Sequence, residues 1–341
     1  MVEQGGSDLH LVSGNPPRIR IHSEIHPVKY RELTVSETRE LIHQILPAGL
    51  EAEFRRAGQV DFSYEVPSLS RFRVNAFLHH GGVGAVVRVV PTRVKSLDDL
   101  DLPPVFRSLC RRRSGFILVT GPTGSGKSTT LAAMVDLINE ERSAHVITIE
   151  QPVEIIHAPK RSLVSQRDVG IHSSGFADAL RSALREDPDV IVVSEMRDLE
   201  TIRLAVTAAE MGSLVLGTLH TVGAITTVER IINAFPADEQ PYIRSMLSTS
   251  LSGIVSQTLV RRADGRGRVA AVEVLINNAA VSNLVREGRV DQLTHVIQAG
   301  GLQGMQTLEN ALRRLVDEGL ITSEDAYRNA RDKSQFRYIR K

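Results

Sequence analysis

The pattern of apolar and polar residues divides this chain into two α/β parts. In residues 1 to about 90, a period of two predicts strands at 9–11, 19–21, 60–66, 71–77 and 84–90. A helix with Ser36 as its N-cap is expected between the second and third of these strands. From residue 114 onward, apolar runs alternate with stretches of helical spacing, which is typical of a mostly parallel sheet covered by helices.

Towards the end of the chain the pattern is mainly helical. Apolar stripes predict helices over 225–234, 243–259 and 305–316, with one strand over 269–276. Residues 92–113 carry charge and proline and lose their periodicity, which is typical of a connection between domains. We therefore predict an N-terminal domain over 1–95, a linker over 96–113 and a second domain over 114–341.

The most informative stretch is FILVTGPTGSGKSTTL, residues 116–131. An apolar run predicts a buried strand, Gly121–Ser128 fits the phosphate-binding pattern G-x-x-x-x-G-K-[ST], and helical spacing follows. Glycines let such a loop bend around phosphates, and the next helix adds its positive N-terminal end. Lys127 is expected to reach the β- and γ-phosphates, and the Ser128 hydroxyl to ligate Mg²⁺. We assign nucleotide binding to Gly121, Pro122, Thr123, Gly124, Ser125, Gly126, Lys127, Ser128 and Thr129.

Acidic residues and a histidine follow the next predicted strands. Ligands of open α/β sheets bind at the carboxyl ends of strands, so Glu154, Glu195 and His220 are candidates for the same edge. An acid after a β-branched run, as at Glu195, holds Mg²⁺ or polarises the attacking water in proteins of this class. Taken alone, His220 is better explained as a packed loop histidine, but the residues around it favour a phosphate contact.

Three arginines of the N-terminal part are candidates for contact with a nucleotide phosphate. The period of two places Arg71 and Arg73 on one face of a strand, and Arg88 lies on the next strand. A solvated sheet face explains them most simply. The alternative is that they reach a phosphate, including one held by another subunit.

Composition narrows the classes of function. Lys+Arg 41 against Asp+Glu 40 gives a net charge of +1, so no overall positive field favours nucleic acid as a partner. The single cysteine, Cys110, indicates neither a disulfide framework nor a zinc cluster. The sequence has no apolar run of the roughly 18 residues that a membrane span needs, and its start lacks a signal-peptide pattern. We therefore expect a cytoplasmic protein.

Several sequence blocks, in the same order over nearly the whole chain, resemble the ATPases of type II secretion and type IV pili. Within that family the chain is most similar to the PilT-type retraction motors. The matching blocks are GPTGSGKSTTLAAM, TIEQPVE, FADALRSALREDPDVI, SEMRDLETIRLA, GTLHT, VSQTLV and GMQTLENAL.

The resemblance implies a homohexameric ATP-hydrolysing motor. Each chain would have a PAS-like N-terminal domain and a RecA-like P-loop domain with extra C-terminal helices. By matching segment, Glu154 resembles the general base, Glu195 the Walker B acid that associates with Mg²⁺, and His220 the histidine of the His box. Arg71, Arg73 and Arg88 resemble the arginines that approach the nucleotide, and this favours that role over a solvated face. The implied partner is a pilus platform protein at the inner membrane.

The chain departs from the family pattern at several positions. Gln151 stands where the acidic box has Asp, Ser213 replaces a His, and Ser194 replaces the Gly before the Walker B acid. The A-I-R-N-L-I-R-E signature of retraction motors reads AVSNLVRE over 280–287. These changes leave open a poorly hydrolysing accessory ATPase. A pilus or secretion assembly ATPase is disfavoured by the single cysteine, and a RecA-like DNA motor by the near-neutral charge. A GTPase is disfavoured because no N-K-x-D motif occurs.

Overall fold

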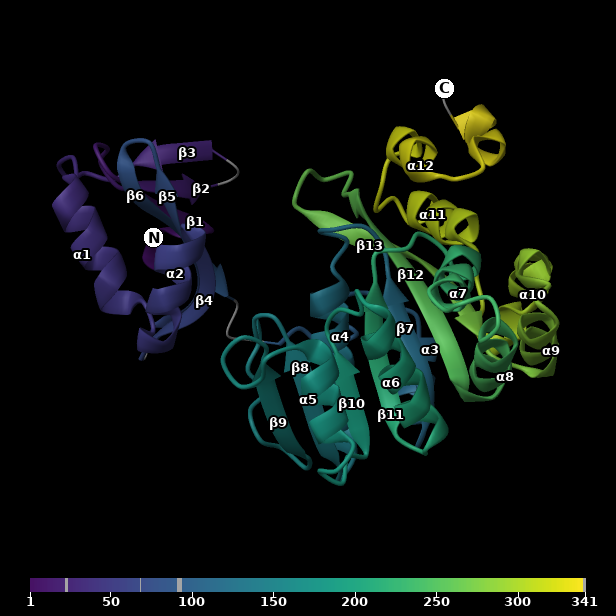
Figure 1. Ribbon diagram of the computed structural model, residues 1–341. Coiled ribbons are helices and arrows are strands. Elements are labelled where there is room, and N and C mark those ends of the chain that lie inside the picture. The colour runs from purple at the N-terminus through teal and green to yellow at the C-terminus, as the bar shows by residue number, and fades with distance from the viewer. Residues whose placement is uncertain (22–23, 68, 91–93, 340–341) are drawn as a thin grey trace. The chain divides into compact units, whose positions relative to one another are not determined.

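A computed structural model of the 341-residue chain describes residues 1–21, 24–67, 69–90 and 94–339. Two compact units divide the chain. The first is Met1–Arg93 with Gln151–Ile156, and the second is Val94–Glu150 with His157–Lys341. Each unit has its own sheet and its own hydrophobic core (Figure 1). Residues 91–93, at the end of the last predicted strand of the first part and the start of the predicted connection, lie outside the described residues.

The first unit contains a six-stranded antiparallel sheet in the order β3-β2-β1-β6-β5-β4. Its strands are β1 (Asp8–Val12), β2 (Arg18–Ile21), β3 (Glu24–Pro27), β4 (Gln59–Val66), β5 (Ser70–His79) and β6 (Gly82–Val90). Helices α1 (Val35–Ile45) and α2 (Glu51–Ala57) lie between β3 and β4 in sequence. The core contains Ile42 of α1 and Phe62, Phe72 and Val74 of the sheet.

The N-cap of α1 is Thr34, so the prediction of Ser36 was two residues late. The Thr34 hydroxyl accepts a hydrogen bond from the Glu37 backbone N–H at 3.3 Å, and the Glu37 carboxylate accepts one from the Thr34 N–H at 2.9 Å. This reciprocal pair satisfies two of the N–H groups that a helix start leaves free. In β5 the predicted alternation is confirmed, because Phe72 and Val74 are buried and Arg71 and Arg73 are half-exposed.

The second unit contains a seven-stranded sheet in the order β13-β12-β7-β11-β10-β8-β9. All neighbours are parallel except β12 and β13. Its strands are β7 (Gly115–Thr120), β8 (His145–Glu150), β9 (Leu163–Asp168), β10 (Val190–Val193), β11 (Leu214–Leu219), β12 (Leu251–Arg261) and β13 (Arg268–Ile276). The predicted parallel sheet from residue 114 onward is therefore confirmed.

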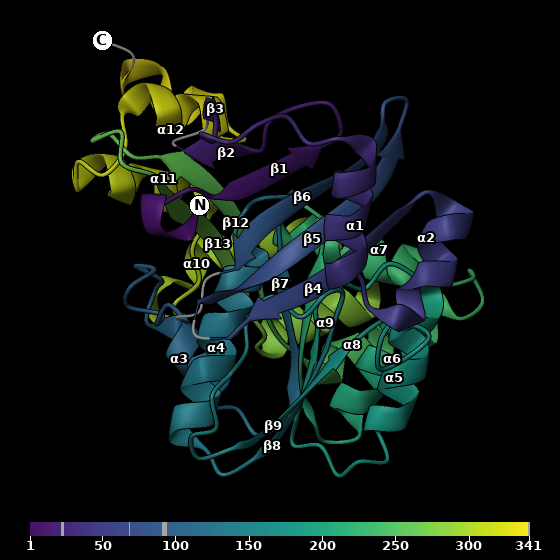
Figure 2. The ribbon, with the colours of Figure 1, turned by 90° about the vertical axis from the view of Figure 1, so that its left-hand side faces the viewer.

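Helices cover both faces of this sheet. Helices α3 (Val105–Cys110) and α4 (Lys127–Glu141) lie on one face, and α5 (Phe176–Ala183) and α6 (Leu199–Glu210) lie on the other (Figures 1 and 2). The remaining helices are α7 (Ala224–Asn233), α8 (Gln240–Ser250), α9 (Ala279–Glu287), α10 (Leu293–Ala299), α11 (Leu308–Asp317) and α12 (Ser323–Asn329). Short 3₁₀ helices occur at Val2–Gln4, Ala48–Leu50, Val290–Gln292, Gly301–Gln303 and Lys333–Ile339. In the described part of the chain, no helix has the length and apolar character needed to cross a membrane.

The predicted helix over 243–259 was wrong in its second half. Helix α8 ends at Ser250, and β12 begins at Leu251. The first seven residues of β12 are all buried, because the strand lies between β7 and β13 inside the sheet. A strand buried on both faces shows no period of two, so its apolar run can be mistaken for a buried helix.

Residues 96–113, for which a linker was predicted, contribute to the core of the second unit. They contain α3, whose Phe106, Leu109 and Cys110 are buried against the β7 and α4 side of the sheet. Leu97 and Leu102 join the same core. Burial raises the pKa of the Cys110 thiol to about 12, so this cysteine is a packing residue.

Phe106→Ala is expected to lower the free energy of unfolding of the second unit by about 3–5 kcal/mol, because it removes a fully buried ring. Arg113→Ala, at an exposed position of the same segment, is expected to change it by less than about 0.5 kcal/mol. Urea unfolding of the full chain measures both. Equal, small effects would show that the segment behaves as a solvated linker.

Candidate nucleotide-binding site

The predicted phosphate loop connects β7 to α4, as its sequence pattern requires. Every residue of β7 is buried, and α4 begins at Lys127. Gly121, Gly124 and Gly126 have φ values of 142°, 77° and 89°, which favour glycine. At Gly121 a Cβ would lie 2.2 Å from the backbone oxygen of Gln257, so no other residue fits there without displacing β12.

Gln257 of β12 contacts both the phosphate loop and the first turn of α4. The sequence pattern did not identify this residue. Its side-chain N–H group donates to the Ser125 carbonyl at 2.7 Å, and its side-chain oxygen accepts from the Thr130 hydroxyl at 2.8 Å. Gln257 is 3% exposed, so both bonds are shielded from water. The pattern gave no signal for it, because the apolar stripe predicts a helix over 243–259 and Gln257 falls within that range.

Lys127 lies within the curve of the loop. Its Nζ donates to the carbonyls of Gly121 and Pro122, both at 2.9 Å, and lies 3.4 Å from Nδ1 of His220. Burial lowers the pKa of the Lys127 ammonium below its usual value, and the Glu195 carboxylate opposes this shift. A cation in this position, at the start of α4, adds to the anion-binding tendency of the loop.

Glu195 and His220 meet because their strands are neighbours. Strands β10 and β11 pair in parallel, so residues that follow their carboxyl ends emerge at one edge of the sheet. His220 Nε2 lies 2.8 Å from one Glu195 oxygen, and Arg197 donates to the other at 2.5 Å. The hydrogen bond from Arg197 lowers the pKa of the Glu195 carboxyl, burial opposes it, and His220 lowers it further. Arg197 is a second residue that the sequence analysis missed.

The structure thus joins three sequence-predicted residues, Lys127, His220 and Glu195, in one chain of contacts. Ser128 and Thr129 occupy the first turn of α4, and the Ser128 side chain is exposed. Among the described residues, no group of three or more His, Cys, Asp or Glu could hold a metal by itself. The oxygen donors of Ser128 and Glu195 fit Mg²⁺ bound jointly with phosphates, which needs only one or two protein ligands.

The other predicted residues belong to the first unit. Arg73 of β5 donates to the Glu154 carboxylate at 3.3 Å, and the segment Gln151–Ile156 is part of this unit. Arg88 of β6 lies directly opposite Arg73 in the sheet register. Its Nε donates to the buried carboxylate of Asp8 at 2.7 Å. Arg71 lies on the same face of β5 as Arg73.

Arg88 therefore has a structural partner. Burial would raise the pKa of the Asp8 carboxyl, yet hydrogen bonds from Ser7 and Arg88 hold it below its usual value. Asp8 is 4% exposed, and a buried carboxylate needs such a counter-charge. A role of Arg88 at a nucleotide remains a prediction.

Two departures from the family pattern can be placed within the second unit. Ser213 precedes the amino end of β11, whereas His220 follows its carboxyl end, so the two lie at opposite edges of the sheet. The Ser213 hydroxyl donates to the Pro188 carbonyl at 3.2 Å. Ser282 lies in α9, and its hydroxyl donates to the Ser248 carbonyl at 2.6 Å. Both serine hydroxyls therefore have hydrogen-bond partners away from the phosphate loop.

Residues 2–340 match the family model described as type II/IV secretion system protein, and the chain belongs to this family. It is 49% identical over 334 residues to the type IV pilus retraction ATPase PilT of Pseudomonas aeruginosa, covering 98% of this chain and 97% of the relative. It is 39% identical to the type IV pilus ATPase PilU of the same organism, covering 99% of this chain and 89% of the relative.

A solved structure of the pilus retraction motor PilT with bound ADP has the same fold. It superposes with a TM-score of 0.92 at 46% identity, covering 98% of this chain and 96% of that one. The resemblance inferred from the sequence blocks is therefore confirmed. The predicted fold class is also confirmed: an N-terminal PAS-like α/β domain and a RecA-like P-loop domain with extra C-terminal helices.

Gln257→Ala is expected to weaken ATP binding by about tenfold, because it removes two buried hydrogen bonds that hold the phosphate loop. Gln298→Ala, at an exposed position of α10, is the matched control and should leave binding unchanged. Titration with a fluorescent ATP analogue measures both. Unchanged affinity in the Gln257 variant would show that the loop keeps its shape without this side chain.

Proposed function

We propose that this chain hydrolyses ATP to power type IV pilus retraction, as a homohexamer. The observation that carries the proposal is the contact chain from Lys127 of the phosphate loop through His220 to Glu195 at one edge of the parallel sheet. The proposal is supported by the near full-length similarity to a pilus retraction ATPase and, at 49% identity over 316 residues, to a twitching motility protein of Neisseria gonorrhoeae.

In this proposal the second unit binds the triphosphate. The N–H groups of the loop and the start of α4 face the phosphates, and Lys127 exchanges its contacts with the loop carbonyls for the β- and γ-phosphates. His220, held by Glu195, contacts the γ-phosphate. Mg²⁺, held by Ser128 and Glu195, would neutralise charge on the phosphates. Catalysis rests on positioning and charge stabilisation.

The first unit supplies the remaining groups. Glu154 is proposed as the general base that accepts the proton of the attacking water, and its bond from Arg73 orients the carboxylate. Arg71, Arg73 and Arg88 are proposed to approach the nucleotide. Repeated binding and hydrolysis would move the two units and so drive a platform protein. The motor would work in the cytoplasm, peripherally at the inner membrane.

A second candidate function is a poorly hydrolysing accessory ATPase. Gln151, three positions before Glu154 in the acidic segment, favours it. Turnover of the purified wild type separates the two. A kcat of roughly 1 per second or more rejects the accessory role, and binding without measurable turnover rejects the motor. Light scattering on the same sample tests the hexamer.

Lys127→Ala is expected to reduce ATP turnover on the order of 100-fold or more, because it removes the charge that stabilises the transferred phosphate. Lys160→Ala is the control, since Lys160 pairs with Asp136 and Glu140 in the second half of α4, away from the phosphate loop. A phosphate-release assay measures both. Undiminished turnover in the Lys127 variant would overturn the site assignment.

Glu154→Gln is expected to lower kcat by about 100-fold or more while ATP still binds, because the amide cannot accept the proton of the attacking water. Glu53→Gln, at an exposed position of α2 in the same unit, should leave kcat unchanged. Single-turnover kinetics separate binding from the chemical step. A Glu154→Gln variant with normal kcat would require another general base.

A further inference from the structure

Two buried side chains fix the segment that carries His220. This segment, His220–Gly223, connects β11 to α7, and its last residue and Ala224 supply the first N–H groups of α7. The Ser256 hydroxyl accepts from the Gly223 N–H at 2.7 Å, and a Glu273 oxygen accepts from the Ala224 N–H at 2.7 Å. A helix start cannot satisfy these N–H groups itself, so the sheet determines where α7 begins.

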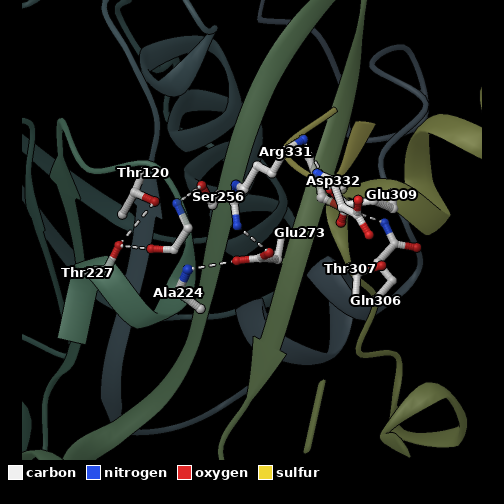
Figure 3. Close-up of polar contacts among 12 residues, drawn as sticks. Thr120, Ala224, Thr227, Ser256, Glu273, Gln306, Thr307, Glu309, Arg331 and Asp332 are labelled. Atoms are coloured by element: carbon white, nitrogen blue, oxygen red, sulfur yellow. Dashed lines mark hydrogen bonds and ion pairs between the residues drawn. The ribbon is translucent and has the colours of Figure 1, made fainter. Parts of the chain in front are cut away.

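Glu273 requires a counter-charge, and Arg331 provides it. Glu273 is 6% exposed, and its second oxygen accepts from Arg331 Nη1 at 2.7 Å (Figure 3). The guanidinium also packs against Gly223, where a Cβ would lie 2.7 Å from the same nitrogen. Loss of Arg331 would leave the carboxylate buried without its partner, which is strongly unfavourable.

Arg331 is in turn held by the C-terminal helices. It follows α12, and its backbone N–H donates to a Glu309 oxygen at 3.2 Å. The Asp332 N–H donates to the same oxygen at 3.1 Å. Glu309 is 9% exposed in the first turn of α11. A continuous set of contacts therefore runs from α11 through Arg331 and Glu273 to the start of α7 (Figure 3).

We propose that Glu273 and Arg331 are positioning residues for His220, through which the C-terminal helices α11 and α12 control ATP turnover. Arg331 packs against Gly223 and Glu273 binds the N–H of Ala224, and these two residues lie three and four positions after His220. A displaced α7 start would move His220 away from Lys127 and Glu195. This inference rests on the proposed ATP hydrolysis and adds a means by which a contact on the C-terminal helices changes its rate.

The test compares Arg331→Gln, Glu273→Gln and the conservative Arg331→Lys. The two charge-removing variants should lower kcat about tenfold and change the KM for ATP by less than about twofold, since the phosphate loop itself is unaltered. Arg331→Lys should recover at least half of the wild-type kcat. Arg328→Gln, which removes an exposed pair with Glu324 in the same helical region, is the control and should match the wild type.

Hydrogen–deuterium exchange supplies a readout that does not depend on turnover. Peptides covering 219–226 should exchange at least fivefold faster in Arg331→Gln than in the wild type and the Arg328 control. Arg331→Lys should restore slow exchange. Far-UV circular dichroism confirms that each compared variant is folded, and the lysine variant keeps the test decisive if Glu273→Gln does not fold.

Unchanged exchange in Arg331→Gln would overturn the inference. Faster exchange with an unchanged kcat would overturn it as well, because the pair would hold the segment without governing turnover. A wild type that binds ATP without hydrolysing it would instead refute the proposed function. In that case the exchange data would still decide whether Arg331 holds the His220 segment.

Discussion

The register of the large sheet is the constraint on which the site depends. Strands β11, β7, β12 and β13 place Leu219, Thr120, Ser256 and Glu273 in one row across the sheet. The phosphate loop begins directly after Thr120, and His220 follows Leu219. Ser256 and Glu273, in the same row, hold the start of α7. One row of paired residues therefore aligns groups that are distant in sequence, from Thr120 to Glu273. A slip of one residue would turn these side chains to the opposite face.

Three charged side chains at or near the site, two buried and one half-buried, each have a neighbour that satisfies them. Lys127 donates to loop carbonyls, Glu195 accepts from Arg197, and Glu273 accepts from Arg331. In the first unit, the buried carboxylate of Asp8 likewise accepts a hydrogen bond from Arg88. Because a buried ion without a partner is costly, these pairs also restrict which elements can move independently. The C-terminal helices are therefore connected by charge as well as by packing to the edge of the sheet that carries the candidate site.

Local sequence patterns predicted most of the secondary structure that is set within one short segment. The strand, loop and helix around Gly121–Lys127 follow from an apolar run, three glycines and helical spacing, all within one short stretch. The strand of Arg71 and Arg73 likewise shows its alternation, since one face of that antiparallel sheet is solvated. The pattern did not predict strand β12, because burial on both faces removes the alternation of apolar and polar residues. For the same reason it did not predict the contacts of Gln257 with the phosphate loop. The sequence of residues 96–113 predicts a linker because α3, with six residues, is too short to show a helical period.

The sequence by itself determined the family, the nucleotide loop and the residue types of the candidate site, because those depend on short patterns and on blocks in a given order. Only the tertiary structure decided which of these residues meet. Contacts such as Lys127 with His220, Gln257 with Ser125, and Glu273 with Arg331 join elements distant in sequence. Strand order and register set those distances, and no local periodicity encodes the order in which strands pair.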